Sequence, residues 1–121
     1  MTARRAKGLT FTAARKIVMA FPGVEEGPCY GTPGFRVRGK LLVRLKEDGA
    51  TLVVKTTFEN RDFLLLGRPD LYFITDHYRD YPYILVRLAM SRADELHELI
   101  EAAWRQAAPK RLVAQYDAES R

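Results

Sequence analysis

Residues 35–46 read FRVRGKLLVRLK, and this stretch decides the fold. Apolar and basic residues alternate with period two on both sides of Gly39-Lys40, a pattern typical of two half-buried strands joined by a two-residue turn. A second turn at residues 47–50 leads into the strand-like residues 51–56. The sequence therefore predicts an antiparallel meander of three strands.

Helical patterns stand before and after this meander. Apolar residues at helical spacing predict three helices, over residues 12–21, 57–67 and 92–108. Thr56 and Ser91 are each followed three residues later by an acidic residue, which is the capping-box pattern of a helix N-terminus. These two residues are therefore expected to cap the second and third helices.

The remaining segments complete the predicted order of elements. Residues 27–33 are rich in glycine and proline and predict a loop or an irregular edge strand, because proline cannot donate to a sheet ladder. Residues 71–74 and 83–88 predict two further strands. The order is then α-β-β-β-α-β-β-α, an α+β fold with an antiparallel sheet and helices packed on one face.

Length and composition fit one globular domain. The chain has 121 residues and one cysteine, Cys29, so no intramolecular disulfide is expected. No apolar run approaches the roughly 20 residues of a membrane span, and no apolar segment follows the N-terminal charges, so a cytoplasmic protein is expected. Residues 10–112 are predicted to form the domain, with a flexible basic arm at 1–9 and a frayed C-terminal tail at 113–121.

Several separated blocks resemble one family of small bacterial proteins. The blocks are YGTPGFRVRGK at residues 30–40, PGVEE at 22–26, HY at 77–78 with YPYILV at 81–86, and AAPK at 107–110. They occur in the order found in the MmcQ/YjbR family, and the resemblance covers about residues 10–112. It implies a CyaY-like fold, which is often described as a double-wing DNA-binding shape. Many members carry tryptophan where this chain has Tyr83.

Basic side chains on the strands are the main functional candidates. Alternation places them opposite the apolar residues that face the helices. The chain carries a net charge of +5, which permits binding to a polyanion. We therefore expect a non-catalytic DNA-binding domain with phosphate contacts from Arg36, Arg38, Lys40, Arg44, Lys46, Lys55 and Arg87. Ordinary solvated surface is the alternative interpretation, because exposed strands commonly carry long basic side chains.

A polar and aromatic loop is the second candidate. Residues 76–81 bring histidine, tyrosine and arginine together and predict a pocket for a small molecule or a partner protein. The candidate lining is Tyr30, His77, Tyr78, Arg79, Tyr81 and Tyr83. Packing of the loop against the sheet, with Arg79 paired to a neighbouring aspartate, is the alternative interpretation.

Sequence motifs of enzymes and metal sites were not found. Neither serine lies in a nucleophile elbow, and the glycines form neither a dinucleotide fingerprint nor a P-loop. The two histidines and one cysteine do not have zinc-ligand spacing. The CyaY-like resemblance suggests iron, but Arg15 and Lys16 on the first helix oppose a cation site. The chain is therefore expected to be non-enzymatic and to need no metal or cofactor.

Overall fold

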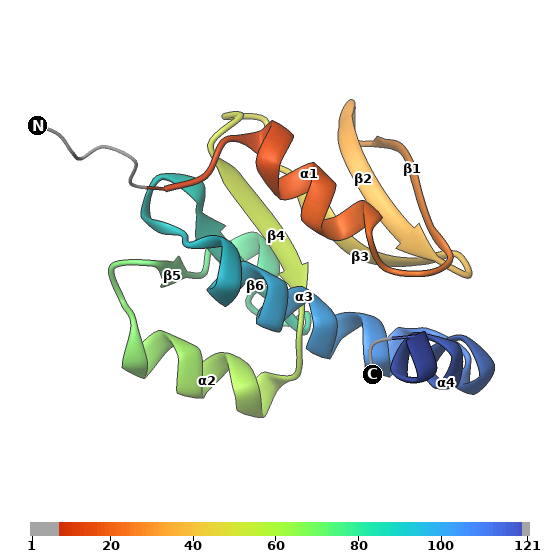
Figure 1. Ribbon diagram of the computed structural model, residues 1–121. Coiled ribbons are helices and arrows are strands. Elements are labelled where there is room, and N and C mark those ends of the chain that lie inside the picture. The colour runs from red at the N-terminus through yellow and green to blue at the C-terminus, as the bar shows by residue number, and fades with distance from the viewer. Residues whose placement is uncertain (1–7, 120–121) are drawn as a thin grey trace, which may run out of the picture.

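The structure is a computed structural model that describes residues 8–119. Its elements follow in chain order (Figure 1). They are α1 Phe11–Met19, β1 Val24–Cys29, β2 Thr32–Val37, β3 Lys40–Leu45, β4 Thr51–Lys55, α2 Phe58–Gly67, β5 Tyr72–Phe73, the 3₁₀ turn η1 Asp76–Tyr78, β6 Tyr83–Arg87, the 3₁₀ turn η2 Leu88–Met90, α3 Ala93–Ala107 and α4 Lys110–Glu119.

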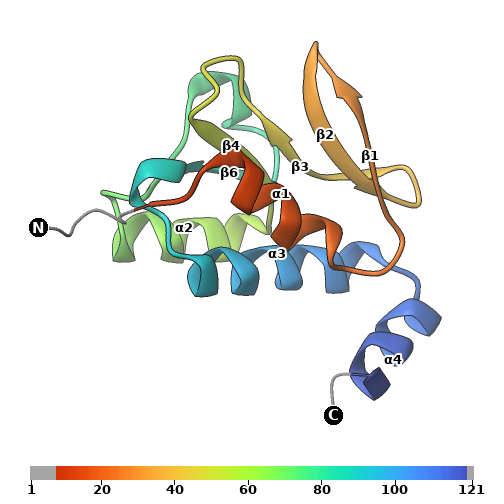
Figure 2. The same ribbon diagram turned by 45° about the horizontal axis from the view of Figure 1, so that its top comes forward.

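The six strands form one sheet in the order β1-β2-β3-β4-β6-β5, and every neighbouring pair is antiparallel. Helices α1 and α3 pack together against one face of this sheet, and α2 packs beside β5 and β6 (Figure 2). The predicted α+β class, antiparallel sheet and helical face are therefore confirmed.

The main core lies between the sheet and the helices. Thr10 caps α1, since its Oγ1 accepts from the Ala13 N–H at 3.1 Å, and the helix then buries Ala14 and Val18. Phe35 and Val54 meet them from the strands and are fully buried. These residues have the period-two and helical spacings expected of core faces, which is why the patterns predicted the two layers correctly.

One edge strand was predicted only as an alternative to a loop. Residues 24–29 form β1, which pairs with β2 from Val24↔Val37 to Cys29↔Thr32. Pro28 has no N–H to donate, but an edge strand needs donors on one side only. The meander therefore has four strands, and the observed order begins with one helix and four strands.

The C-terminal tail is helical, so the expectation of a frayed tail from residue 113 is wrong. Pro109 ends α3 as predicted, but α4 begins at the next residue. Leu112, Val113 and Tyr116 of α4 pack against the main core. Because proline is well suited to the first turn of a helix, Pro109 separates two helices here instead of ending the fold.

Two smaller predictions also need correction. The N-cap of α2 is Thr57, whose Oγ1 accepts from the Asn60 N–H at 3.0 Å, and the residue before α3 is Arg92, with no side-chain cap. Ser91 donates instead to the Arg87 carbonyl. Residues 1–7 of the predicted arm lie outside the described residues, whereas the Leu9 N–H donates to the Leu88 carbonyl at 2.8 Å.

A close contact in the β1–β2 hairpin leads to a stability prediction. A Cβ added at Gly34 would lie 2.7 Å from the Cys29 Cβ, whereas one added at the paired Gly27 meets nothing within 4 Å. We expect Gly34→Ala to lower the free energy of unfolding by about 1–3 kcal/mol and Gly27→Ala to change it by less than about 1 kcal/mol. Urea denaturation of both variants checks this, and equal effects would contradict it.

Candidate functional site

The second face of the sheet carries its own small apolar cluster. Val53 of β4, Leu85 of β6 and Tyr78 of η1 are buried together, with Ile74 and Tyr83 packed around them. The segment that holds η1 thus folds over the face away from α1 and α3 (Figure 2). We call residues 74–83 the η1 segment. The sheet face opposite the helices was expected to be exposed to solvent, but this segment covers part of it.

Arg61 of α2 holds this segment in place. Its Nη1 donates to the carbonyl oxygens of Tyr78 at 3.1 Å and Tyr81 at 2.8 Å, and its Nη2 donates to that of Arg79 at 3.0 Å. The arginine itself is buried. One guanidinium thus joins three backbone carbonyls of the segment. Those of Tyr78 and Tyr81 also accept from the N–H groups of Tyr81 and Tyr83. Arg61 was not expected from the sequence, because backbone carbonyl partners leave no signature in the side-chain pattern.

Arg44 of β3 lies beneath the η1 segment and is buried, so its predicted role as an exposed phosphate contact is wrong. Its Nη1 donates to the Tyr78 hydroxyl at 2.9 Å, and its Nη2 donates to Thr32 Oγ1 at 3.3 Å and Glu47 Oε2 at 3.0 Å. Its Nε finds no hydrogen-bond partner among the described residues. Burial lowers the pKa of this guanidinium, but the hydrogen bonds to Tyr78 and Glu47 outweigh burial and raise it. Arg44 is therefore a fixed positive charge.

A pocket of about 290 Å³ opens above Arg44. Its lining comes from the β1–β2 turn, the end of β3 with the residues just after it, and the η1 segment. We call it the outer-face pocket, and its lining residues are Tyr30, Arg44, Lys46, Glu47, Thr75, His77 and Tyr78. It thus combines members of both predicted residue sets with Glu47 and Thr75, which neither set contained.

Tyr30 forms one wall of the outer-face pocket from the tip of a tight turn. Tyr30 and Gly31 connect β1 to β2 with φ angles of 54° and 80°, so both lie in the left-handed region. The Thr32 hydroxyl closes the turn by donating to the Cys29 carbonyl at 2.9 Å. The Tyr30 ring is 78% exposed, and its centroid lies 5.3 Å from the Arg44 guanidinium carbon. The ring is thus exposed to solvent beside the buried cation.

Glu47 supplies the negative charge of the outer-face pocket. Its Oε2 pairs with Arg44, and its Oε1 lies 3.8 Å from Lys46 Nζ. Its own backbone amide and the Arg44 guanidinium hold the pKa of the Glu47 carboxyl below its ordinary value. The side chain is 62% exposed, so Glu47 can turn away from Arg44 without loss of packing.

The η1 segment contributes unequally to the pocket. His77 is exposed and places its ring 4.7 Å from the Tyr78 ring in an edge-on arrangement. Arg79 pairs with Asp76, and Tyr81 points to solvent; neither lines the outer-face pocket. Of the six predicted lining residues, the structure brings together Tyr30, His77 and Tyr78.

Tyr83 supports the pocket from behind. Its ring lies 6.0 Å from that of Tyr78, and its hydroxyl donates to the Leu41 carbonyl at 3.3 Å. Lys55 at the end of β4 places its Nζ 5.6 Å from the Tyr83 ring centroid, away from the residues that line the pocket. Tyr83 and Lys55 therefore belong to the surroundings of the pocket and not to its lining.

The other predicted phosphate contacts differ in their surroundings. Arg36 is half-buried on β2, whereas Arg38 and Lys40 are exposed at the β2–β3 turn. Arg87 lies at the end of β6, where its guanidinium donates to the carbonyls of Pro69 and Asp70 and covers the Phe73 ring. Burial of Arg44 and the carbonyl contacts of Arg87 therefore remove two members from the predicted basic face.

A smaller basic cluster does form at the β2–β3 turn. Arg38 and Lys40 border a shallow hollow with Lys110, the first residue of α4. No ion pair joins any of the three to a carboxylate within residues 8–119. We call these three residues the hairpin-tip cluster.

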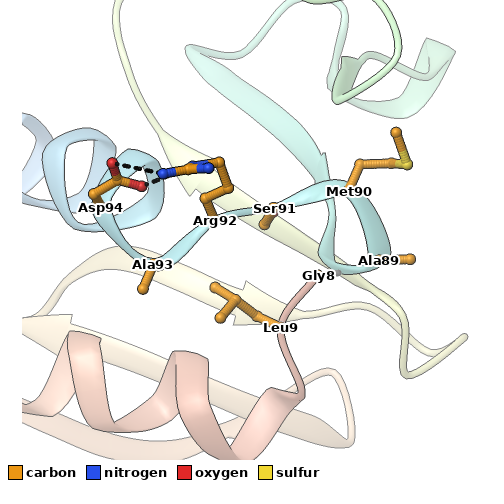
Figure 3. A pocket seen from close by; sticks show the side chains of 8 residues that line it. All are labelled: Gly8, Leu9, Ala89, Met90, Ser91, Arg92, Ala93 and Asp94. Atoms are coloured by element: carbon orange, nitrogen blue, oxygen red, sulfur yellow. Dashed lines mark hydrogen bonds and ion pairs between the residues drawn. The ribbon is translucent and has the colours of Figure 1, made fainter. Parts of the chain in front are cut away.

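A larger hollow lies elsewhere, at the junction of the N-terminal segment with η2 and α3 (Figure 3). Its volume is about 750 Å³, and Gly8, Met90 and Arg92 lie along it. Its charged side chains are already paired, because Arg92 Nε donates to Asp94 Oδ1 at 3.2 Å (Figure 3). We therefore place the candidate site at the outer-face pocket, where a buried cation faces the cavity.

The described part of the chain holds neither a cluster of metal ligands nor a membrane-spanning helix. No three acidic, histidine or cysteine side chains within residues 8–119 gather as a metal would require. No helix in the same range is long and apolar enough to cross a membrane.

The half-buried phenol of Tyr83 leads to a pH prediction. Burial raises the pKa of Tyr83, so the unfolded chain loses this proton first, near pH 10. The contribution of the protonated Tyr83 to the free energy of unfolding is then complete below about pH 10, and it falls as pH rises toward the folded-state pKa. We expect Tyr83→Phe to lose less stability than wild type between about pH 9 and 11, measured by urea denaturation. Tyr81→Phe, with its exposed ring, is the control; equal curves for all three proteins would contradict the prediction.

Comparisons with known proteins agree with this architecture. The YjbR family model matches residues 19–106. The uncharacterized proteins Mb2600 of Mycobacterium bovis and Rv2570 of Mycobacterium tuberculosis are each 41% identical to this chain over 73 residues. The match covers 60% of this chain and 57% of each relative, so it spans little more than half the length of these curated proteins.

A solved structure shows the same fold. The crystal structure of the Deinococcus radiodurans protein DR2400, described with the domain DUF419, superposes with a TM-score of 0.71 and 18% sequence identity. The superposition covers 89% of this chain and 84% of that chain. Since the family model matches more than half of the residues, this chain belongs to the YjbR family.

Proposed function

We propose that the protein binds a small anionic molecule in the outer-face pocket, without chemical conversion of that molecule. The observation that carries the proposal is the buried guanidinium of Arg44, which borders the cavity and keeps one N–H unpaired within the described residues. Lys46 adds a second positive charge to the same lining.

The setting of Arg44 favours binding over mere surface charge. Charge-assisted hydrogen bonds strengthen where the donor is shielded from water, and the Arg44 side chain is only 4% exposed. Hydrogen bonds to Tyr78 and Thr32 hold the guanidinium in one orientation before any ligand arrives. Preorganisation of this kind lowers the ordering cost of binding.

The test is titration calorimetry with inorganic phosphate and with acetate at constant ionic strength. We expect saturable binding at one site, weakened at least threefold by Lys46→Ala. Lys55→Ala is the matched control, because it also removes one strand-end lysine but leaves the pocket lining intact. No binding of either anion, or equal weakening by both variants, would overturn the proposal. Arg44→Lys keeps the positive charge but loses the planar guanidinium with its paired N–H donors, so it should also weaken the binding of both anions.

A second candidate function is DNA binding at the hairpin-tip cluster. The supporting observation is that Arg38, Lys40 and Lys110 converge there without a carboxylate partner among the described residues. Three phosphate contacts predict weak binding that falls steeply with salt. Fluorescence anisotropy of labelled duplex across a salt series tests this, with Arg38→Ala and Lys40→Ala combined. Binding that is unchanged in the double variant, or absent at low salt, would rule this candidate out.

A further inference from the structure

We propose that the outer-face pocket selects a planar aromatic ring that carries an acidic group, either phosphate or carboxylate. The acidic group replaces the Glu47 carboxylate at Arg44, and the ring stacks against Tyr30. This inference rests on the proposed function, since it assigns the class of ligand that the same pocket takes.

Tyr30 supplies the first argument. Bulky side chains rarely adopt a positive φ, and turns of this geometry are usually built from asparagine, aspartate or glycine. Here the left-handed position holds a tyrosine whose ring is 78% exposed. The ring buries little of its own surface, so its placement does not serve the core. A residue that departs from the usual backbone preference of its position is found mainly at functional sites. An exposed ring beside a pocket also offers a surface on which a ligand ring can stack.

The aromatic character of the remaining lining supplies the second argument. His77 is exposed and borders the same cavity, and Tyr78 forms part of its wall. Ligand sites are typically lined by aromatic groups with a few polar groups that fix orientation. At about 290 Å³ the cavity is at the lower end of the range of small-molecule sites, which suits one ring with one substituent.

Glu47 supplies the third argument. Its carboxylate already occupies an anion position at Arg44, with Oε2 3.0 Å from Nη2. The tether is short, since the two residues are three apart in sequence, and the Glu47 side chain is largely exposed. Only the Glu47 end of this pair is exposed, and a ligand anion that takes its place keeps the buried Arg44 guanidinium paired, so the exchange costs little. Glu47 therefore acts as an internal competitor, and its removal should strengthen the binding of anions.

The test compares matched probes by titration calorimetry at constant pH and ionic strength. Phenyl phosphate is compared with inorganic phosphate, and benzoate is compared with acetate. We expect each aromatic probe to bind at least tenfold more tightly than its partner, and the tighter of the two aromatic probes identifies the preferred acidic group. Equal affinities within both pairs would overturn the inference.

Two variants assign the effect to residues. Tyr30→Asn removes the ring but suits the left-handed turn, so phenyl phosphate should then bind no more tightly than inorganic phosphate, and benzoate no more tightly than acetate. Tyr81→Ala, an exposed tyrosine outside the pocket, is the control. Glu47→Gln should lower the dissociation constant of every anionic probe at least threefold. A preference that survives in Tyr30→Asn, or unchanged affinity in Glu47→Gln, would contradict the assignment.

The two proposals fail in different ways. If inorganic phosphate does not bind, or binds without dependence on Lys46, the proposed function is wrong. If inorganic phosphate binds and depends on Lys46 but the ring adds nothing, only the ligand class inferred here is wrong.

Discussion

Arg61→Ala is expected to lower the free energy of unfolding by about 3 kcal/mol. The substitution removes three hydrogen bonds that a buried guanidinium donates to the η1 segment, at the carbonyls of Tyr78, Arg79 and Tyr81. Hydrogen bonds from a charged donor are stronger than those between neutral groups, and the Arg79 carbonyl is left with no other donor among the described residues. The loss is measured by urea denaturation followed by far-ultraviolet circular dichroism.

The same variant should also lose binding of inorganic phosphate, because the η1 segment carries part of the pocket lining. Arg79→Ala is the matched control, since Arg79 is exposed and within residues 8–119 its side chain pairs only with the exposed Asp76. It should change stability by less than about 0.5 kcal/mol. Arg61→Lys should recover less than half of the loss, because one ammonium cannot reproduce the guanidinium fork. A loss below about 1 kcal/mol in Arg61→Ala would contradict the role given to Arg61.

Trp104→Ala should be the most destabilising single change, with a loss of about 4 kcal/mol. The Trp104 side chain of α3 is completely buried, with its ring 5.6 Å from that of Phe21 and 5.0 Å from that of Tyr116. Its indole N–H donates to the Pro22 carbonyl at 2.8 Å, which ties α3 to the chain just after α1. Truncation therefore removes packing at three elements at once.

Trp104→Phe separates the packing from the hydrogen bond. It keeps a ring in the core but leaves the Pro22 carbonyl without its donor, so we expect a loss of about 1–2 kcal/mol. Both variants are measured by guanidinium denaturation. Equal losses in the two variants would show that the hydrogen bond, and not ring volume, dominates at this position, contrary to this prediction.

Periodicity predicted the parts of the fold whose neighbours are close in sequence. The alternation in residues 35–46 correctly predicted the β2–β3 hairpin, and the helical spacing before Pro109 correctly predicted α3. Trp104 lies within this helical pattern and is completely buried. β1 was harder to predict, because Gly27 and Pro28 interrupt any alternation, and its identity depends on pairing with β2.

The candidate site was only half predictable, because its defining contacts are long-range. Alternation correctly placed Arg44 on the face opposite the helices, but its burial depends on Tyr78, which lies 34 residues away. The same holds for Arg61, whose carbonyl partners begin 17 residues later. Tyr30 and His77 were named as pocket residues from their chemistry, and the structure places both at one cavity.

Binding in the outer-face pocket is tested residue by residue in an amide NMR titration of the ¹⁵N-labelled protein with phenyl phosphate. We expect saturable shift changes at residues 30–31, 44–47 and 75–78, which line or adjoin the outer-face pocket, and unchanged signals at Arg38 and Lys110 of the hairpin-tip cluster. Shift changes centred on the hairpin-tip cluster, or none that saturate, would contradict this expectation.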